Sequence, residues 1–472
     1  MEVARSNYIV SNKAVFRKLQ QALSAKYGYA SVLACDGRQQ TYSVSGRGTS
    51  ISDGNMFGKR GYVARVHNGK AYAEYAGNEI SEDKIPEIVN AVETRLAEMA
   101  DSWDRYDTPV MNEEKAEFIK STEYKVHPEE LGDEQIIAKL SDLREKTKAL
   151  DERLIDCVAN LSYQYYNKLF LSDNKDLEEN VLWTCGALMV LATRGEELKD
   201  AYKGFSILGG AELLDDMEEY GPKIVKTCID LLDSEPMIPG EYECICSPET
   251  TGMIVHEAFG HGVEMDMFVK DRALAKNCMG DMIASELVTM RDGAACGPEV
   301  ATFFFDDEGV LAHDTLVIDH GKLVSGYADA VSAARLGVEA TGNGRRESVE
   351  RKAYTRMTNT FFEGGKDKLE DMIASVEYGM LLEDPSSGME DPKNWGIQCM
   401  VSIAREIKDG KLTGRIFSPC VLTGYVPDLL KSISMMSENV ELGGSGACGK
   451  GHKEWVKVSD GGPWIKAKIR LG

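Results

Sequence analysis

Two histidines and a glutamate within six residues are the strongest candidates for chemistry in this sequence. The stretch HEAFGH at residues 256–261 places Glu257 directly after His256 and ends with His261. Imidazoles are common metal ligands, and a carboxylate facing a metal-bound water is the usual general base. The stretch therefore predicts a metal site bound by His256 and His261, with Glu257 as the base. Short strings of this kind also arise by chance, so the motif needs further support.

The spacing of the two histidines constrains the backbone that carries them. Positions i and i+5 of a straight helix lie about 140° apart, so both rings could not reach one ion. Ser247 and Pro248 are typical of a helix start, which puts His256 on a helix. Gly260 precedes His261 and makes a break in the helix easy. We therefore expect His261 at or beyond an irregular helix end.

A catalytic zinc site usually has three protein ligands, so a third ligand is needed. The first candidate is Cys448, within the glycine-rich stretch LGGSGACGKG at residues 442–451. His452 is a second candidate, and a buried thiol with no ligand role is the alternative for Cys448. The other histidines fall in predicted turns and loops, where solvent-exposed side chains are expected: His67, His127, His313 and His320.

The glycine-rich stretch also resembles the start of a phosphate-binding loop. Gly444, Gly449 and Lys450 have the spacing of that motif, but Gly451 stands where a serine or threonine should hold magnesium. No convincing helix follows the stretch. These two features exclude a nucleotide-binding loop.

Hydrophobic periodicity indicates the elements that must position these residues. Apolar residues at helical spacing predict a helix over residues 136–154, and period-two alternation predicts an antiparallel meander over 157–208. The stretch SEPMIPG at 234–240 predicts a boundary. We expect an N-terminal α/β region at residues 1–110, a helix with the meander at 111–235, and a metallopeptidase domain at 236–472.

Composition excludes several classes of protein. The 472 residues carry a formal charge of −23, which argues against direct nucleic-acid or membrane binding. The longest uncharged apolar run, residues 181–193, is too short to cross a bilayer, and no signal peptide is visible. Eleven cysteines without paired spacing favour a reducing cytoplasm.

Five segments in the same order resemble one known family, the TldD/PmbA family, and specifically its metal-carrying TldD branch. The segments are HEAFGHGVEMD at 256–266, TGNGRRES at 341–348, RMTNT at 356–360, SVEYG at 375–379 and CGK at 448–450. The resemblance implies an α+β fold. An N-terminal α/β region would be followed by a C-terminal domain that is rich in antiparallel strands and carries the HExxxH helix.

The resemblance also implies an activity and a ligand set. It implies a zinc metalloprotease that cleaves unstructured peptides or partly unfolded proteins, with one zinc ion per metal-carrying subunit. His256, His261 and Cys448 would bind the zinc, and Glu257 would be catalytic. It further implies a dimer, with a PmbA/TldE-like paralogue or a second copy as partner. The alternative is a regulatory protein of the gyrase-modulator type, whose metal is structural.

Other residues of the shared segments have weaker expected roles. Arg345, Arg346, Arg356 and Asn359 would either hold a peptide backbone or order loops through hydrogen bonds. Glu264 and Asp266 would either orient a ligand histidine or lie in a solvated turn.

Overall fold

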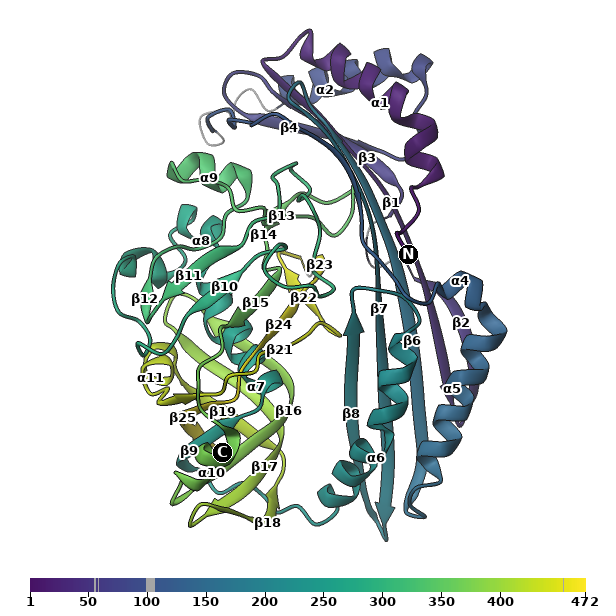
Figure 1. Ribbon diagram of the computed structural model, residues 1–472. Coiled ribbons are helices and arrows are strands. Elements are labelled where there is room, and N and C mark those ends of the chain that lie inside the picture. The colour runs from purple at the N-terminus through teal and green to yellow at the C-terminus, as the bar shows by residue number, and fades with distance from the viewer. Residues whose placement is uncertain (55–56, 58, 99–106, 453) are drawn as a thin grey trace.

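The computed structural model describes residues 1–54, 57, 59–98, 107–452 and 454–472. The N-terminal half of the chain builds a long curved sheet, and the C-terminal half builds a β-rich body beside it (Figure 1). Helices and strands both contribute, so the fold is α+β, as the resemblance implied. No helix in the described part of the chain has the length and apolar character needed to cross a membrane.

Eight strands form the long sheet. Six of them follow the order β4-β3-β1-β6-β7-β5, and the other two pair beside this path, β2 with β1 and β8 with β7. They are β1 (Tyr29–Ser45), β2 (Gly48–Gly54), β3 (Gly61–His67), β4 (Tyr72–Gly77), β5 (Ala116–Ser121), β6 (Leu154–Leu171), β7 (Lys175–Arg194) and β8 (Glu197–Ile207). The predicted meander is confirmed, because β6, β7 and β8 pair antiparallel in sequence order.

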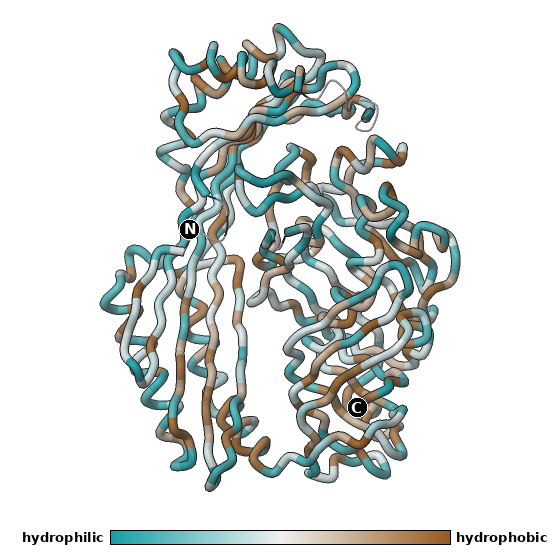
Figure 2. Tube along the Cα trace, turned by 180° about the vertical axis from the view of Figure 1, so that it is seen from behind, coloured by the Kyte–Doolittle hydropathy of each residue, from teal (hydrophilic) through white to brown (hydrophobic). Residues whose placement is uncertain are grey.

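The residue pattern of β6 explains how the sheet is covered. Burial alternates in the first half of the strand, as expected where only one face is packed, and becomes nearly continuous towards Leu171. In that second half the two faces have separate cores. Leu169 packs with the helices, whereas Phe170 packs against Phe305 of the C-terminal half. Figure 2 shows hydrophobic runs along the lower parts of these long strands.

Helices pack on one face of the long sheet, which we call the outer face. They are α1 (Asn7–Ser24), a 3₁₀ turn η1 (Glu82–Lys84), α2 (Ile85–Glu98), α4 (Pro128–Leu131), α5 (Asp133–Lys148) and α6 (Leu213–Leu231). The predicted helix over 136–154 is too long. It ends at Lys148, and Leu154 already opens β6, because Asp151 accepts a hydrogen bond from the Arg153 N–H and turns the chain.

The C-terminal half contains two sheets. The seven-stranded sheet comprises β9 (Gly240–Cys246), β16 (Tyr378–Asp391), β17 (Gly396–Lys408), β18 (Lys411–Phe417), β19 (Cys420–Tyr425), β20 (Met435–Met436) and β25 (Ile465–Leu471). The six-stranded sheet comprises β10 (Met290–Asp292), β11 (Thr315–Asp319), β12 (Lys322–Leu323), β15 (Asn359–Phe362), β21 (Glu441–Gly443) and β24 (Ser459–Gly462).

Two hairpins and several short helices complete this half. The hairpins are β13 (Gly344–Arg345) with β14 (Tyr354–Thr355), and β22 (Ala447–Lys450) with β23 (Glu454–Lys457). The helices are α7 (Pro248–Met253), η3 (Ile254–Phe259), η4 (Gly260–Val263), α8 (Met265–Val269), η5 (Leu274–Cys278), α9 (Ala330–Leu336), α10 (Leu369–Ala374) and α11 (Val426–Lys431). Helix α7 and η3 are buried between the two sheets in one large core.

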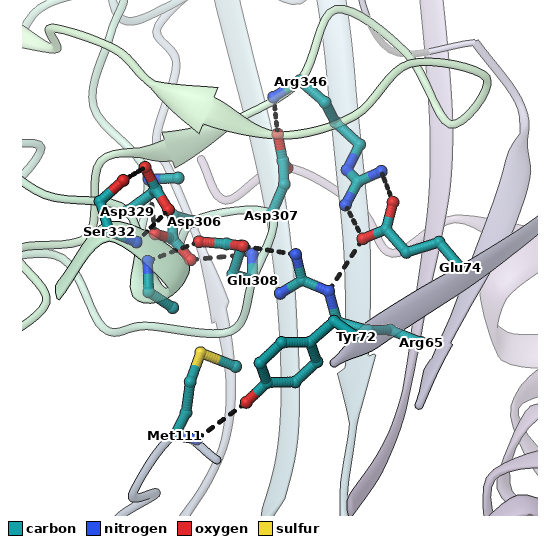
Figure 3. Close-up of polar contacts among 12 residues, drawn as sticks. Arg65, Tyr72, Glu74, Met111, Asp306, Asp307, Glu308, Asp329, Ser332 and Arg346 are labelled. Atoms are coloured by element: carbon teal, nitrogen blue, oxygen red, sulfur yellow. Dashed lines mark hydrogen bonds and ion pairs between the residues drawn. The ribbon is translucent and has the colours of Figure 1, made fainter. Parts of the chain in front are cut away.

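Five charged residues, which we call the ion network, join strands β3 and β4 of the long sheet to the C-terminal half: Arg65, Glu74, Asp307, Glu308 and Arg346 (Figure 3). Arg65 on β3 contacts Glu74 at 2.9 Å and Glu308 at 2.6 Å. Arg346 contacts Glu74 at 3.0 Å, and its backbone N–H donates to Asp307 at 2.8 Å. The two halves therefore meet through matched charges as well as apolar contacts. The domain boundaries expected from the sequence stay predictions.

Candidate metal centre

The helix that carries the HEAFGH stretch changes geometry inside the motif. Ser247 caps α7 by accepting a hydrogen bond from the Thr250 N–H, and Pro248 is its first residue. After Met253 the backbone widens into a π-helical turn, η3, which is followed by the 3₁₀ turn η4. The expected irregular helix end is therefore confirmed. The change of pitch brings His256 and His261 together despite their five-residue separation, with ring centroids 5.1 Å apart.

Cys448 reaches the same point from the other end of the C-terminal half. It lies on β22, in a hairpin held by the buried Arg356. The Arg356 guanidinium donates hydrogen bonds to the backbone carbonyls of Cys448 and Glu454, one on each strand. Arg356 therefore fixes the hairpin that directs the Cys448 thiol towards His261.

His256, His261 and Cys448, which we call the donor cluster, offer ligand atoms within 4.8 Å of one another. The Cys448 Sγ lies 3.5 Å from the His261 Nε2. Tetrahedral zinc, with bonds of about 2.1 Å to nitrogen and 2.3 Å to sulfur, separates two such ligands by about 3.6 Å. The spacing of Cys448 and His261 therefore fits a zinc-sized ion between them.

Electrostatics in the donor cluster favour a thiolate. Burial alone would raise the pKa of the Cys448 thiol, but the imidazoles of His256 and His261 hold that pKa well below its usual value. Burial lowers the pKa of His261, whereas Glu264 and Cys448 raise it, and the result lies well above the usual value. Anionic sulfur next to two imidazoles is the donor chemistry that zinc prefers.

An acidic residue behind the donor cluster orients one of its histidines. The His261 Nδ1 lies 3.1 Å from the Glu264 Oε2, which leaves the Nε2 facing Cys448. Lys450 donates to Glu264 at 3.0 Å and to Asp266 at 2.6 Å. Glu264 thus has the orienting position that the sequence analysis offered as one alternative, whereas Asp266 holds Lys450 and Lys270.

Glu257 lies beside the donor cluster and lines a cavity of about 440 Å³, which we call the cleft. Its carboxylate oxygens are 3.9 Å from the His256 Nε2 and 3.8 Å from the His261 Nε2. Burial raises the pKa of Glu257, which makes this carboxylate a better proton acceptor than an exposed one. The cleft runs between β8, the middle of β16, and β21 with the loop that follows it.

Several other predicted residues lie away from the cleft. His452 is exposed and is outside the donor cluster. His67 was expected in a solvated turn, but it is 1 % exposed because its Nε2 bonds to the Thr108 carbonyl. The arginines and the asparagine of the shared segments do not line the cleft, and they bond inside the protein: Arg345, Arg346, Arg356 and Asn359. They order loops.

Asp460 is a site residue that the sequence analysis missed. It lines the cleft from β24, and its Oδ2 lies 3.9 Å from the His256 Nδ1. It belongs to none of the five shared segments, and the pairing of β24 with β15 and β21 brings it there. No pattern in the sequence pointed to it.

Comparisons with known proteins identify relatives of this chain. Residues 239–468 match the family model described as the PmbA/TldA metallopeptidase C-terminal domain. A metalloprotease from Methanocaldococcus jannaschii is 25% identical over 444 residues, which cover 93% of this chain and 95% of that protein. A zinc metalloprotease TldD homolog from Saccharolobus solfataricus is 26% identical over 342 residues, or 71% of this chain and 76% of the relative.

A solved structure shares the fold. TldE from Thermococcus kodakarensis matches with a TM-score of 0.74 at 18% identity, over 96% of this chain and 99% of that chain. The likeness therefore covers both the long sheet and the C-terminal half.

Proposed function

This chain belongs to the TldD/PmbA family, and from that premise we propose that it is a zinc-dependent metallopeptidase. Its relatives are named metalloproteases, and one is named a zinc metalloprotease. The observation that carries the proposal is the donor cluster with Glu257 beside it, at the wall of an open cleft. In the proposal His256, His261 and Cys448 hold one zinc ion per chain.

The donor set supports a catalytic ion more than a structural one. Structural zinc sites usually have four protein ligands, whereas catalytic sites have three and keep one position open. Among the described residues the cluster contains three. Glu257 faces the cluster, but it also lines the cleft, where a substrate could reach it. These features favour the enzyme over the regulatory alternative.

The protein's own groups have separate roles in the proposed reaction. When bound, zinc supplies Lewis acidity that polarises a carbonyl and lowers the pKa of water. Glu257 accepts the proton of the attacking water and delivers it to the leaving amine. Glu264, fixed by Lys450, keeps the His261 ring in the orientation that leaves its Nε2 free. Arg356 keeps Cys448 in reach.

The shape of the cleft supports an extended peptide as the substrate. Strand β8 pairs with β7 on one side, and none of the described strands pairs with its other side. Residues 202–206 of that strand and β21 both line the cleft. A peptide added as a strand would bind through its backbone, which is available only in unstructured substrates and gives weak sequence preference.

Two further parts of the proposal concern partner and location. We propose a dimer with a PmbA/TldE-like paralogue or with a second copy, which light scattering of the purified chain, alone and mixed with such a paralogue, would distinguish. We also propose a cytoplasmic location, since all eleven cysteines are free and a ligand thiolate requires reducing conditions.

The decisive experiment is the substitution Glu257→Gln. We expect the variant to bind one zinc per chain, by metal analysis, and to lose about 10²–10⁴-fold in cleavage of an unstructured peptide. Glu249→Gln is the matched control, because Glu249 lines the same cleft but pairs with Lys203, whereas Glu257 contacts the two histidines of the donor cluster. Retained turnover by Glu257→Gln, in a preparation that holds zinc, would refute the mechanism.

A further inference from the structure

The outer face of the long sheet changes character between its two helical cores. On β1, Ala34 packs with α1 and α2, whereas Tyr42 packs with α5 and α6. On β6, Leu169 belongs to the core with α1 and α2, and Tyr165 belongs to the core with α5 and α6. Between them the outer positions become polar.

These polar positions line a cavity of about 360 Å³, which we call the outer pocket. Its lining includes Asp36 and Asn167, which are directly paired across β1 and β6. Their neighbours Cys35 and Lys168 point to the C-terminal half, so Asp36 and Asn167 face away from it. The outer pocket shares no lining residue with the cleft, and it lies within the size range of small-molecule sites.

Three arginines line the outer pocket, and each uses one part of its guanidinium for a carboxylate. Arg5 contacts Glu178 at 2.5 Å through its Nε, and Arg60 contacts Asp36 at 2.8 Å through its Nε. Arg38 contacts Glu129 at 2.6 Å through its Nη2. A guanidinium has five N–H donors in a fixed fork, so the pairs hold these groups in place and leave donors unused.

Helix α1 directs its N-terminus into the same pocket. The helix has 18 residues and no acidic residue in its first turn. The Ser6 side chain accepts a hydrogen bond from the Ile9 N–H. Asn7 and Tyr8 both line the outer pocket, and no described residue accepts a hydrogen bond from their backbone N–H groups. The positive end of a long helix with free N–H groups favours an anion.

Two further polar groups in the lining have no partner among the described residues. Asn167 is 6 % exposed, yet its Oδ1 accepts no hydrogen bond, and the Tyr8 Oη is buried without a partner. A buried polar atom without a partner costs about 1–3 kcal/mol, which a bound molecule would remove. An amide and a hydroxyl can each donate or accept after rotation, so both suit an oxygen-rich ligand.

We propose that the outer pocket binds a small organic molecule through an oxyanion group, either phosphate or carboxylate. The α1 N-terminus and the free donors of Arg38 and Arg60 would hold the oxyanion, with Tyr8 and Asn167 contacting its oxygens or adjoining hydroxyls. The proposal concerns a site on the opposite face of the sheet from the cleft, and it does not depend on the peptidase.

The test uses the full chain with inorganic phosphate and with acetate as separate probes, at an ionic strength kept constant with sodium chloride. Thermal unfolding and calorimetric titration report binding, since a ligand of the native state raises the melting temperature. Tyr8→Phe removes only an oxygen that has no partner, so folding is preserved. Arg60→Met removes a charged donor, and Arg47→Met, in the exposed turn after β1, is the matched control.

We expect phosphate or acetate to stabilise the wild type, and the probe that does so identifies the chemistry of the ligand. Affinity should fall about tenfold or more in Arg60→Met and less in Tyr8→Phe, but stay unchanged in Arg47→Met. The proposal is overturned if neither anion binds the wild type, or if Arg60→Met and Tyr8→Phe both bind as tightly as Arg47→Met does.

Discussion

The donor cluster and the ion network both bury polar groups, but they balance charge in different ways. In the ion network each carboxylate faces an arginine or an N–H group of the chain itself. Beside the donor cluster, Glu257 has only the two imidazoles as ion-pair neighbours among the described residues, and the same two imidazoles stabilise the Cys448 thiolate. A buried thiolate and a neighbouring carboxylate whose partners are themselves ligand-type imidazoles are suited to an external ion. A set that is already paired is suited to joining two parts of a fold.

The largest expected effect comes from breaking the donor cluster. Cys448→Ala removes a ligand, and we expect zinc affinity to fall by about 100-fold or more, measured by competition with a chromophoric chelator. Cys420→Ala is the control, because the only hydrogen bond of this buried thiol within the described residues goes to the Phe417 carbonyl. Equal zinc affinity in the two variants would exclude Cys448 as a ligand.

Substitutions in the ion network should lower the stability of the fold and leave the metal content unchanged. Arg346→Met leaves the half-buried Glu74 with one arginine fewer, and we expect the free energy of unfolding to fall by about 3 kcal/mol in a denaturant titration. The double variant Arg346→Met with Glu74→Gln should recover part of this loss, because the stranded charge is gone. If Arg346→Met lowered the free energy of unfolding by no more than a surface substitution does, Arg346 would not stabilise the contact between the two halves. Zinc binding should be unchanged in both variants.

The ion network also predicts acid sensitivity. Burial alone would raise the pKa of Glu74, but Arg346 and Arg65 lower it to about 2 in the folded chain, from 4.5. The folded state therefore binds the Glu74 proton less readily than the unfolded state. The resulting stability is present above about pH 4.5 and is lost as the pH falls towards 2.

We expect Glu74 to contribute up to about 3 kcal/mol in this way. The measurement compares wild type and Glu74→Gln by denaturant titration at neutral pH and in steps below pH 4.5. The difference between them should shrink as the pH falls. A difference that is independent of pH would show that the arginines do not act through the Glu74 charge.

The smallest effect is expected where charges are paired in solvent. Lys18 and Glu82 form an ion pair in which the side chains are 52% and 62% exposed. Lys18→Met should change the free energy of unfolding by less than about 1 kcal/mol, because water screens the pair. A loss comparable to that of Arg346→Met would mean that burial is not what separates the two kinds of ion pair.

The residues of the donor cluster were predictable because each carries a local signal. The HEAFGH stretch contains two ligand-type side chains, and Gly260 with the five-residue spacing required a change in helix pitch, which η3 provides. Cys448 stood out only by its glycine-rich surroundings and by the family resemblance. The approach of its Sγ to the His261 Nε2 depends on Arg356, whose bonds to the hairpin carbonyls cross 92 and 98 residues of sequence.

The ion network and the outer pocket were not predictable in this way. Arg346 was noted in the sequence, but its partner Glu74 lies 272 residues away on a strand with no motif. Likewise, nothing in the alternating pattern of β1 and β6 distinguishes Asp36 and Asn167 from solvent-facing residues of an ordinary strand. Only the packing of separate helix groups above and below them makes a pocket at that point.

The sequence by itself determined the elements and the chemistry: period-two strands, the capped helix, the two imidazoles, the carboxylate and the thiol. These depend on side-chain type and on spacing along a few turns of chain, which local sterics and burial control. The tertiary structure decided which distant groups meet. It brought Cys448 and Asp460 to the histidines and matched Glu74 with Arg346, because pairing of strands far apart in sequence has no local signature.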